Sequence, residues 1–352
     1  MASRPAPQNV LELPVPEITQ RAQTRYIPGT SFRVAAQSDV ACECPQQRCP
    51  SSGCSVCDES GRVRAFDISA VSMFRSRPQS QRLFESPVTA SEFVDASQFR
   101  IGLTPGFEAG LIAYDFVPLF DLEVRALWMD EWADGTAQNF SGRTIRILTE
   151  PPLGTSGPRE TVTMYRSAFL NAEVNARFHP FGVQRPTTLL AGFRMFRLQE
   201  DLTAIFADPF GVLPDEQMLT ETDNHLYGLQ IGLDRGILEG CRSCLRLRSR
   251  VGLYGNQSDQ LSQAVSLASP PVTFPVRGSG QSLAFQAELG LQAGFRITES
   301  LNLITSYRCM YLNGLAVASE QLAASNFPLA TGLHTNGSLL LQSTSVGLEF
   351  VY

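Results

Sequence analysis

Long stretches of alternating apolar and polar residues recur along this chain, and the gaps between them are long and short in turn. Each stretch is predicted to be a β-strand, because successive side chains of a strand point to opposite faces. The ten predicted strands are 63–73, 99–114, 119–130, 160–178, 187–199, 223–236, 244–256, 281–297, 301–315 and 338–351. The gaps hold 25, 4, 29, 8, 23, 7, 24, 3 and 22 residues. This rhythm predicts an up-and-down antiparallel transmembrane β-barrel with short periplasmic turns and long extracellular loops.

A membrane barrel turns the apolar face of each strand outward, whereas a soluble barrel turns it inward. In 283–297 every odd residue is apolar, whereas the even residues include Gln286, Glu288 and Arg296. The predicted strands exceed the five or six residues typical of soluble sheets and match the roughly 9–11 that a tilted membrane strand needs. The chain also ends on an aromatic residue. Other aromatic residues near predicted strand ends suit interfacial girdles: Tyr114, Phe116, Trp128, Phe178, Tyr227, Tyr254, Phe350 and Tyr352. We therefore expect the apolar rows to face lipid.

The composition narrows the class of protein further. Of the 352 residues only 18% are charged, all the basic ones are Arg, and the formal net charge is −6. A mildly acidic chain without a basic patch gives no reason to expect nucleic-acid binding. No run of 18 apolar residues occurs, which excludes a membrane-spanning helix.

The N-terminal part differs from the rest. Residues 1–60 show no sustained period and are expected to form an irregular tail, followed by the barrel over 61–352. The stretch 1–30 lacks the apolar segment of a signal peptide. Because the barrel pattern indicates export, a trimmed sequence or a misassigned start is the explanation we favour over a protein that is not exported.

Charged residues gather on the face that a membrane barrel turns inward. They are predicted to line the lumen: Asp121, Glu123, Arg125, Glu173, Arg177, Arg194, Arg246, Arg248, Arg250, Glu288 and Arg296. Ten strands enclose a narrow space, and guanidinium groups buried there need partners. One interpretation is an ion-pair network that fills the barrel. The other is a narrow Arg-lined path for small solutes or ions, with a preference for anions.

The cysteines form two groups that are candidates for disulfides. Seven candidates occur: Cys42, Cys44, Cys49, Cys54, Cys57, Cys241 and Cys244. In an exported protein, disulfides are the expected use, although thiolates this dense could also bind zinc. We predict no metal and no other cofactor, and we expect Cys241 and Cys244 to clamp a short turn.

One pair of residues suggests an enzyme as a distant alternative. Omptins are ten-stranded outer-membrane proteases that use an Asp–His pair with acidic residues at the rim, and Asp223-x-His225 resembles that pair. Asp130, Glu131 and Asp134 end another strand on the same side. An Asp–His pair can activate water. However, His225 shares its face with Tyr227 and would point to lipid, so we predict that the chain is not an enzyme.

Several segments resemble the outer-membrane β-barrel (porin-like) family of planctomycete bacteria. They are Tyr165-Arg166-Ser167, Glu173-Val174-Asn175, Ala191-Gly192-Phe193-Arg194, Asn224 to Gly232, Gly252 to Asn256, Ala287 to Gly290 and Tyr307-Arg308. The resemblance spans roughly residues 60–352. It implies an exported protein of the outer membrane, with the lipid bilayer and small solutes or ions as partners, and no catalytic residues. We expect a porin-like narrow channel, with a non-conducting structural or adhesion barrel as the alternative. The oligomeric state stays open.

Overall fold

The structure is a computed structural model, and it describes residues 64–352 apart from a set of gaps. The gaps are 88–90, 118, 141–143, 148, 150–152, 157–158, 181–186, 209, 211–214 and 267–271. The chain divides into two compact units, 1–48 and 49–352, and the described residues all belong to the second. The predicted N-terminal tail over 1–60 therefore lies outside the described residues.

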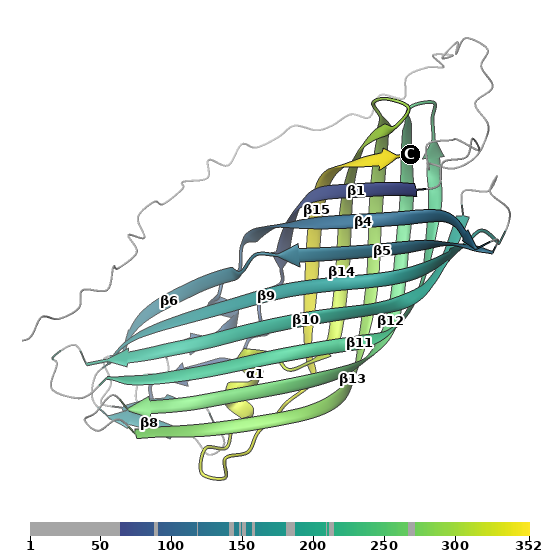
Figure 1. Ribbon diagram of the computed structural model, residues 1–352. Coiled ribbons are helices and arrows are strands. Elements are labelled where there is room, and N and C mark those ends of the chain that lie inside the picture. The colour runs from purple at the N-terminus through teal and green to yellow at the C-terminus, as the bar shows by residue number, and fades with distance from the viewer. Residues whose placement is uncertain are drawn as a thin grey trace, which may run out of the picture. The chain divides into compact units, whose positions relative to one another are not determined.

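Ten long antiparallel strands form a closed ring, as the sequence predicts (Figure 1). Each strand pairs with its neighbour in the chain, and the first and last strands close the ring, with Ala65 opposite Val351. The strands are β1 Arg64–Arg75, β4 Leu103–Val117, β5 Phe120–Met129, β9 Arg159–Phe178, β10 Thr187–Ala207, β11 Glu216–Glu239, β12 Ser243–Ser266, β13 Val272–Arg296, β14 Leu301–Leu315 and β15 Gly337–Val351. Each strand of the ring is paired on both sides over at least part of its length. Among the described residues, the stretch Val272–Ala284 of β13 and the strand next to β9 at the loop end pair on one side only.

The two ends of the barrel differ in their connections. At one end lie the connections 118–119, 179–186, 240–242 and 297–300, together with the start of β1 and the end of β15. We call this the turn end and the opposite one the loop end. The alternation of short and long connections at the two ends is that of an up-and-down barrel.

Two of the expected long loops are wrong, because the strands continue through them. β10 runs on to Ala207 and β11 begins at Glu216, so most of the expected loop 200–222 is strand. Likewise β12 runs to Ser266 and β13 begins at Val272, which replaces most of the expected loop 257–280. These strands keep pairing beyond the predicted ends, with Glu200 opposite Thr222 and Gln260 opposite Gly278.

The other three long connections carry secondary structure of their own. After β5 the chain continues as β6 Trp132–Phe140, which pairs with the first half of β9 on the same side as β5. A separate small sheet has the strand order β3-β2-β7-β8. Its strands are β2 Arg82–Glu85, β3 Phe93–Asp95, β7 Thr144–Ile147 and β8 Leu153–Ser156, with the short 3₁₀ helix η1 Ala96–Gln98 after β3. The connection between β14 and β15 holds the helix α1 Ala318–Ala324.

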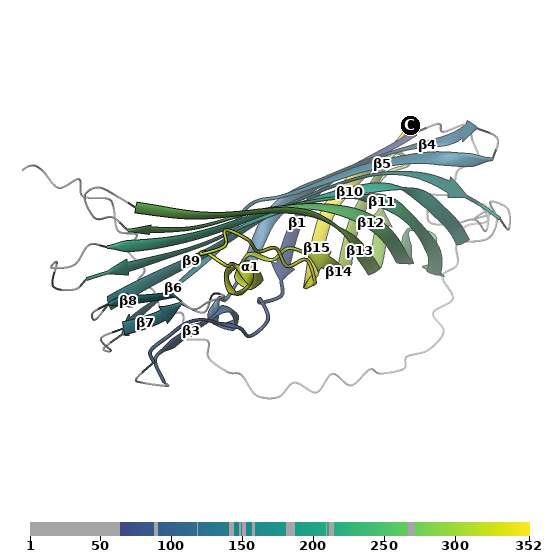
Figure 2. The same cartoon turned by 90° about the horizontal axis from the view of Figure 1, so that it is seen from below.

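The small sheet and α1 pack against the inner face of the long strands at the loop end (Figure 2). Phe84 of β2 meets Phe206 of β10 edge to face, with ring centroids 5.1 Å apart. α1 has only seven residues and no side-chain cap, so packing holds it rather than intrinsic propensity. We call α1, η1 and the small sheet the plug. No helix in the described part of the chain is long and apolar enough to cross a membrane.

The inner and outer faces of a strand exchange polarity between the two ends. In β10, Phe193 and Met195 point outward and Arg194 points inward, whereas three residues later Arg197 points outward and Phe196 and Leu198 point inward. In β10 the half toward the turn end is therefore polar inside and apolar outside, and the half toward the loop end is mostly apolar inside and polar outside. In β12 the inner residues Asn256, Ser258 and Gln260 stay polar toward the loop end. A single apolar core, built from the plug and the inner faces of the long strands, occupies the loop end.

Candidate functional site

Arg125 of β5 lies at the centre of one group of charges in the lumen. Its guanidinium donates to Glu123 (2.6 Å), to both oxygens of Asp67 (3.0 and 3.1 Å) and to Glu108 (3.1 Å). Arg308 of β14 donates to the other oxygen of Glu108. Four strands, β1, β4, β5 and β14, thus send side chains to one point inside the barrel.

A second group lies on the side formed by β9–β13. Arg194 is fully buried and donates to Glu288 (2.8 Å) and Asn171 (2.8 Å), with Glu173 at 3.5 Å. Arg250 pairs with the other oxygen of Glu173 and lies 4.0 Å from Glu123, which links this group to the first. Together the two groups form a continuous layer of charge across the lumen, which we call the ion-pair network. Paired and hydrogen-bonded charges are the form in which buried ions are tolerated.

Toward the turn end the distances between the charged groups of the network become longer. Arg177 lies 3.5 Å from Glu123 and 3.8 Å from Asp234, and Arg248 lies 3.9 Å from Asp234. Both oxygens of Asp234 and the Nε atoms of Arg177 and Arg248 are buried and have no hydrogen-bond partner among the described residues. Distances of this length suit bridging waters.

Two small cavities lie within the network. Each measures about 10 Å³, and Glu108, Arg248 and Arg308 line both. A volume of this size holds about one water molecule. Beyond the network, Ala65, Ile112 and Val351 form a small apolar cluster at the turn end, and the plug fills the loop end. The network, this cluster and the core therefore place side chains at successive levels of the lumen.

Every residue predicted to line the lumen has its side chain on the inner face, but not all join the network. Asp121 lies near the turn end and pairs with His179 (2.9 Å). Arg246 and Arg296 are half-buried near the same end, and the Nε atom of Arg296 has no partner among the described residues. Asp67, Glu108 and Arg308 belong to the network but were not among the residues predicted to line the lumen. The same alternation could have found them, because each lies between two outward-facing residues of its strand.

A separate ion pair ties the barrel wall to the plug. Arg75 donates to Glu200 and to the hydroxyl of Tyr165 (3.0 Å), and that hydroxyl donates to Glu200 (2.8 Å). Glu200 also accepts a hydrogen bond from the backbone N–H of Ala318, the first residue of α1 (2.9 Å). Because Arg75 and Glu200 are buried in the apolar core, the contact fixes α1 against β1, β9 and β10.

Two carboxyl groups of the plug have shifted pKa values of opposite sign. Burial alone would raise the pKa of Asp95, but hydrogen bonds from Ser97 and Ser80 outweigh it and lower the pKa. Burial raises the pKa of Glu320 on α1, and a contact with His334 (3.0 Å) only partly offsets it. Asp95 therefore favours its charged form where it caps η1.

The outer wall between the two ends carries an apolar belt. Exposed Phe, Leu, Ile and Val side chains follow every second residue of the wall strands there, for example Leu229 and Ile231 on β11 and Leu289 and Leu291 on β13. An apolar outside around a polar inside is the reverse of a soluble barrel and matches a membrane-spanning one. Two expected girdle residues are wrong. Tyr254 points inward and is buried against Phe196, with ring centroids 5.2 Å apart. Tyr114 packs against the apolar cluster of Ala65, Ile112 and Val351 inside the turn end.

The Asp223–His225 pair lies on the outer wall, just above the belt. The His225 Nε2 atom is 3.3 Å from Asp223, and its ring stacks on Tyr227. Arg197 donates twice to the same carboxylate (2.7 and 3.2 Å). Glu131 and Asp223 line one outer hollow of about 730 Å³. The structure thus brings part of the expected rim constellation together, but on the outside of the barrel.

The cysteine predictions stay predictions. The five residues Cys42 to Cys57, with their zinc alternative, lie outside the described residues. Cys241 lies in the turn between β11 and β12, and Cys244 is near the start of β12. No group of three or more His, Cys, Asp and Glu in the described part of the chain could hold a metal ion. Counting thiols before and after reduction tests the proposed bond between Cys241 and Cys244.

Comparisons with solved structures find several matches at low sequence identity. The outer-membrane protease OmpT of Escherichia coli matches with 10% identity and a TM-score of 0.42, over 82% of this chain and 97% of that one. The toluene transporter TodX of Pseudomonas putida matches with 9% identity and a TM-score of 0.28, over 82% and 89%. CarO of Acinetobacter baumannii matches with 10% identity and a TM-score of 0.20, over 78% and 98%. No family model and no curated protein sequence matches. At these TM-scores the likeness carries no argument about activity, and the architecture rests on the strand pairing itself.

Proposed function

We propose that this chain is an outer-membrane barrel that does not conduct solutes and serves as a structural or adhesion scaffold. The ion-pair network supports this proposal, because its charged side chains meet across the lumen and the two cavities described among them measure about 10 Å³ each. The apolar core at the loop end is a second barrier on the same path. A conducting barrel needs a continuous row of sites that an ion or solute can enter and leave.

The energetics of the network favour a fixed filling over a path. Arg125, Arg194 and Arg250 each contact at least two carboxylates inside the barrel. Removing one partner from a buried ion pair costs about 3–5 kcal/mol. A passing anion would have to displace such contacts, so the network resists opening.

Single-channel recording on the full chain in a planar bilayer tests the proposal. The sample first has to show a folded barrel by a mobility shift on boiling in a cold detergent gel. We expect no discrete channels from such a sample. Reproducible current steps from folded protein would overturn the proposal.

A narrow anion channel is the second candidate function. Buried atoms of Asp234, Arg177 and Arg248 that have no hydrogen-bond partner in the described part of the chain favour it, because they suit a chain of waters at the turn end. If current steps occur, Arg248→Glu should shift the ion preference from anions toward cations. A conductance that Arg248→Glu leaves unchanged would not come from this lumen.

We also propose that the chain is not an enzyme, because Asp223 is held by Arg197 and faces away from the lumen. The chain should not cleave Arg-containing peptides. Cleavage that is lost in His225→Ala, but kept in Gln257→Ala on the neighbouring strand position, would contradict this.

A further inference from the structure

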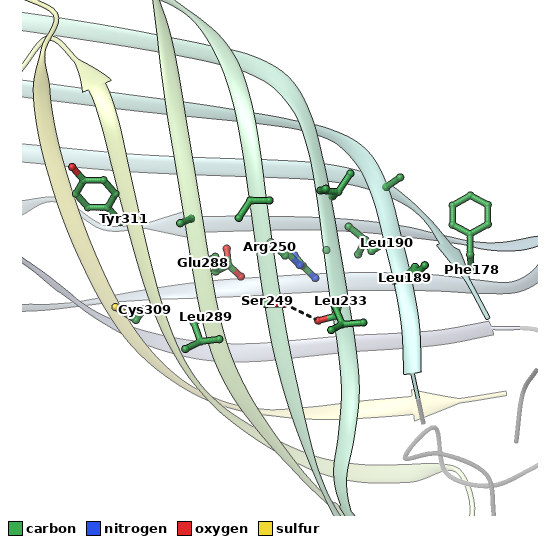
Figure 3. Close-up of a pocket in the computed structure, with 15 residues that line it drawn as sticks. Phe178, Leu189, Leu190, Leu233, Ser249, Arg250, Glu288, Leu289, Cys309 and Tyr311 are labelled. Carbon is green, nitrogen blue, oxygen red and sulfur yellow. Dashed lines mark hydrogen bonds between the residues drawn. The ribbon is translucent and has the colours of Figure 1, made fainter. Parts of the chain in front are cut away.

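A groove crosses the outer wall within the apolar belt. It has a volume of about 780 Å³ and is formed by side chains of β9–β14 (Figure 3). This volume lies within the roughly 300–1,000 Å³ of typical ligand pockets, which are also largely apolar. The side chains that face outward into the groove are nearly all apolar, among them Leu189, Ile231, Val251 and Leu289.

The groove arises where small residues meet across neighbouring strands. Ala191, Ile231, Val251, Ala287 and Tyr311 stand opposite one another in a single row across β10–β14. The short side chains of Ala191 and Ala287 leave a depression in this row. Two residues further toward the turn end, the larger Leu189 and Leu233 stand opposite each other. The depth of the groove is therefore set by two alanines.

One cation lies at the end of the groove. Arg235 is the next outward-facing residue of β11 after Leu233, about 7 Å along the strand toward the turn end. Its partners across the two neighbouring strands are Thr187 and Leu247, neither of which is charged. An exposed guanidinium at the edge of an apolar belt attracts anionic lipid headgroups.

We propose that this groove binds one acyl chain of an anionic glycerophospholipid, whose phosphate pairs with Arg235. The groove is continuous with the belt that faces lipid, so an acyl chain is the occupant it meets. Arg235 supplies the charge complementarity that distinguishes an anionic lipid from a neutral one. The proposal requires that the barrel lies in a bilayer, but it does not depend on whether the lumen conducts.

Photo-crosslinking in vesicles tests the site. The full chain is folded into phosphatidylcholine vesicles that contain a small fraction of phosphatidylglycerol with a diazirine on one acyl chain. Labelled peptides are then mapped by mass spectrometry. We expect the label to concentrate on 187–193, 229–235, 249–253 and 285–291. Unlabelled phosphatidylglycerol should compete for these positions at low fractions.

Variants separate the groove from the belt as a whole. Ala191→Trp and Ala287→Trp fill the groove and should reduce its labelling to that of the surrounding belt. Ala126→Trp, on the outer face of β5, is the matched control and should leave it unchanged. Arg235→Gln should remove a preference for phosphatidylglycerol over phosphatidylcholine of roughly two- to fivefold.

Several results would overturn the site. Labelling spread evenly around the belt, or not saturable in the wild-type protein, excludes a specific groove. Absence of lipid label at Ala191 in a protein that runs as a dimer on the unboiled gel would mean that a second copy covers the groove. Failure of the chain to enter vesicles at all would instead overturn the membrane barrel, and the boiling-dependent mobility shift separates these cases.

Discussion

The two halves of this barrel solve the problem of filling a lumen in opposite ways. At the turn end, charged side chains from facing strands neutralise one another, as Arg125 does with Asp67 and Glu108. At the loop end, apolar side chains of the wall pack on the plug, as Phe206 does with Phe84. Arg194 joins the two, since its guanidinium lies 4.5 Å from the ring centroid of Phe196.

This difference shows that the polarity of the outer face of a strand limits which residues its inner face can carry. Where the wall is apolar outside, the only place left for polar residues of an alternating strand is the lumen. In β10, where the outer face is polar, the apolar residues point inward and join the core that the plug completes. One strand therefore behaves as a membrane strand in one half and as a soluble strand in the other.

The largest effect is expected from breaking the network at Arg194. Arg194→Leu leaves Glu288 and Glu173 without this partner in a buried site, so it should lower the free energy of unfolding by about 3–5 kcal/mol. Arg197→Leu, on the outer face of the same strand, removes a partly exposed pair and should cost about 0.2–1 kcal/mol. Urea unfolding of the vesicle-inserted protein, followed by fluorescence of Trp128 and Trp132, measures both. Equal losses would contradict the contrast between inner and outer pairs.

A charged residue introduced on the outer wall should show where the apolar belt ends. Phe193→Arg places a guanidinium in the belt and should destabilise the inserted barrel by about 2–4 kcal/mol. Gln199→Arg, six residues further along the same face, lies above the belt and should change the stability by less than about 0.5 kcal/mol. The same unfolding assay compares the two variants. A large loss for Gln199→Arg would show that the belt extends farther toward the loop end.

The smallest effect concerns the plug and depends on pH. Asp95→Ala removes the cap of η1 and should cost about 1 kcal/mol at pH 7. Because the folded-state pKa of Asp95 lies below its unfolded value, its contribution is present above the unfolded pKa and is lost as the pH falls through the folded pKa. The gap between Asp95→Ala and wild type should therefore narrow below about pH 4. Asp95→Asn keeps the cap without the charge, so its stability should change less with pH than that of the wild type.

The sequence alone was sufficient to predict the ten strands of the ring and their order. The alternation of apolar and polar residues in 281–297 and 160–178 predicts a strand in each segment. In an up-and-down barrel the order of the strands in the chain determines which strands are neighbours. It also predicts that Glu173, Arg194 and Arg250 face the lumen. It does not predict which of them meet, because that depends on the register across the ring.

The extensions of β10, β11, β12 and β13 at the loop end were not predicted, and the reason is physical. In β10 the apolar residues change from odd to even positions between Met195 and Phe196, so a search for one continuous alternation ends there. The plug escaped for another reason. Its strands have only three or four residues, and its helix has no capping side chain, so tertiary packing rather than local pattern defines them.

The pairing of β1 with β15 makes the order of synthesis matter. Every other contact in the ring joins strands that are neighbours in the chain, whereas this one joins residues such as Ala65 and Val351. A growing chain can thus form hairpin after hairpin, yet β1 keeps an open edge until β15 exists. Formation of β15 is then the step that separates a sheet with an open edge at β1, prone to edge-to-edge association, from a ring closed at the turn end.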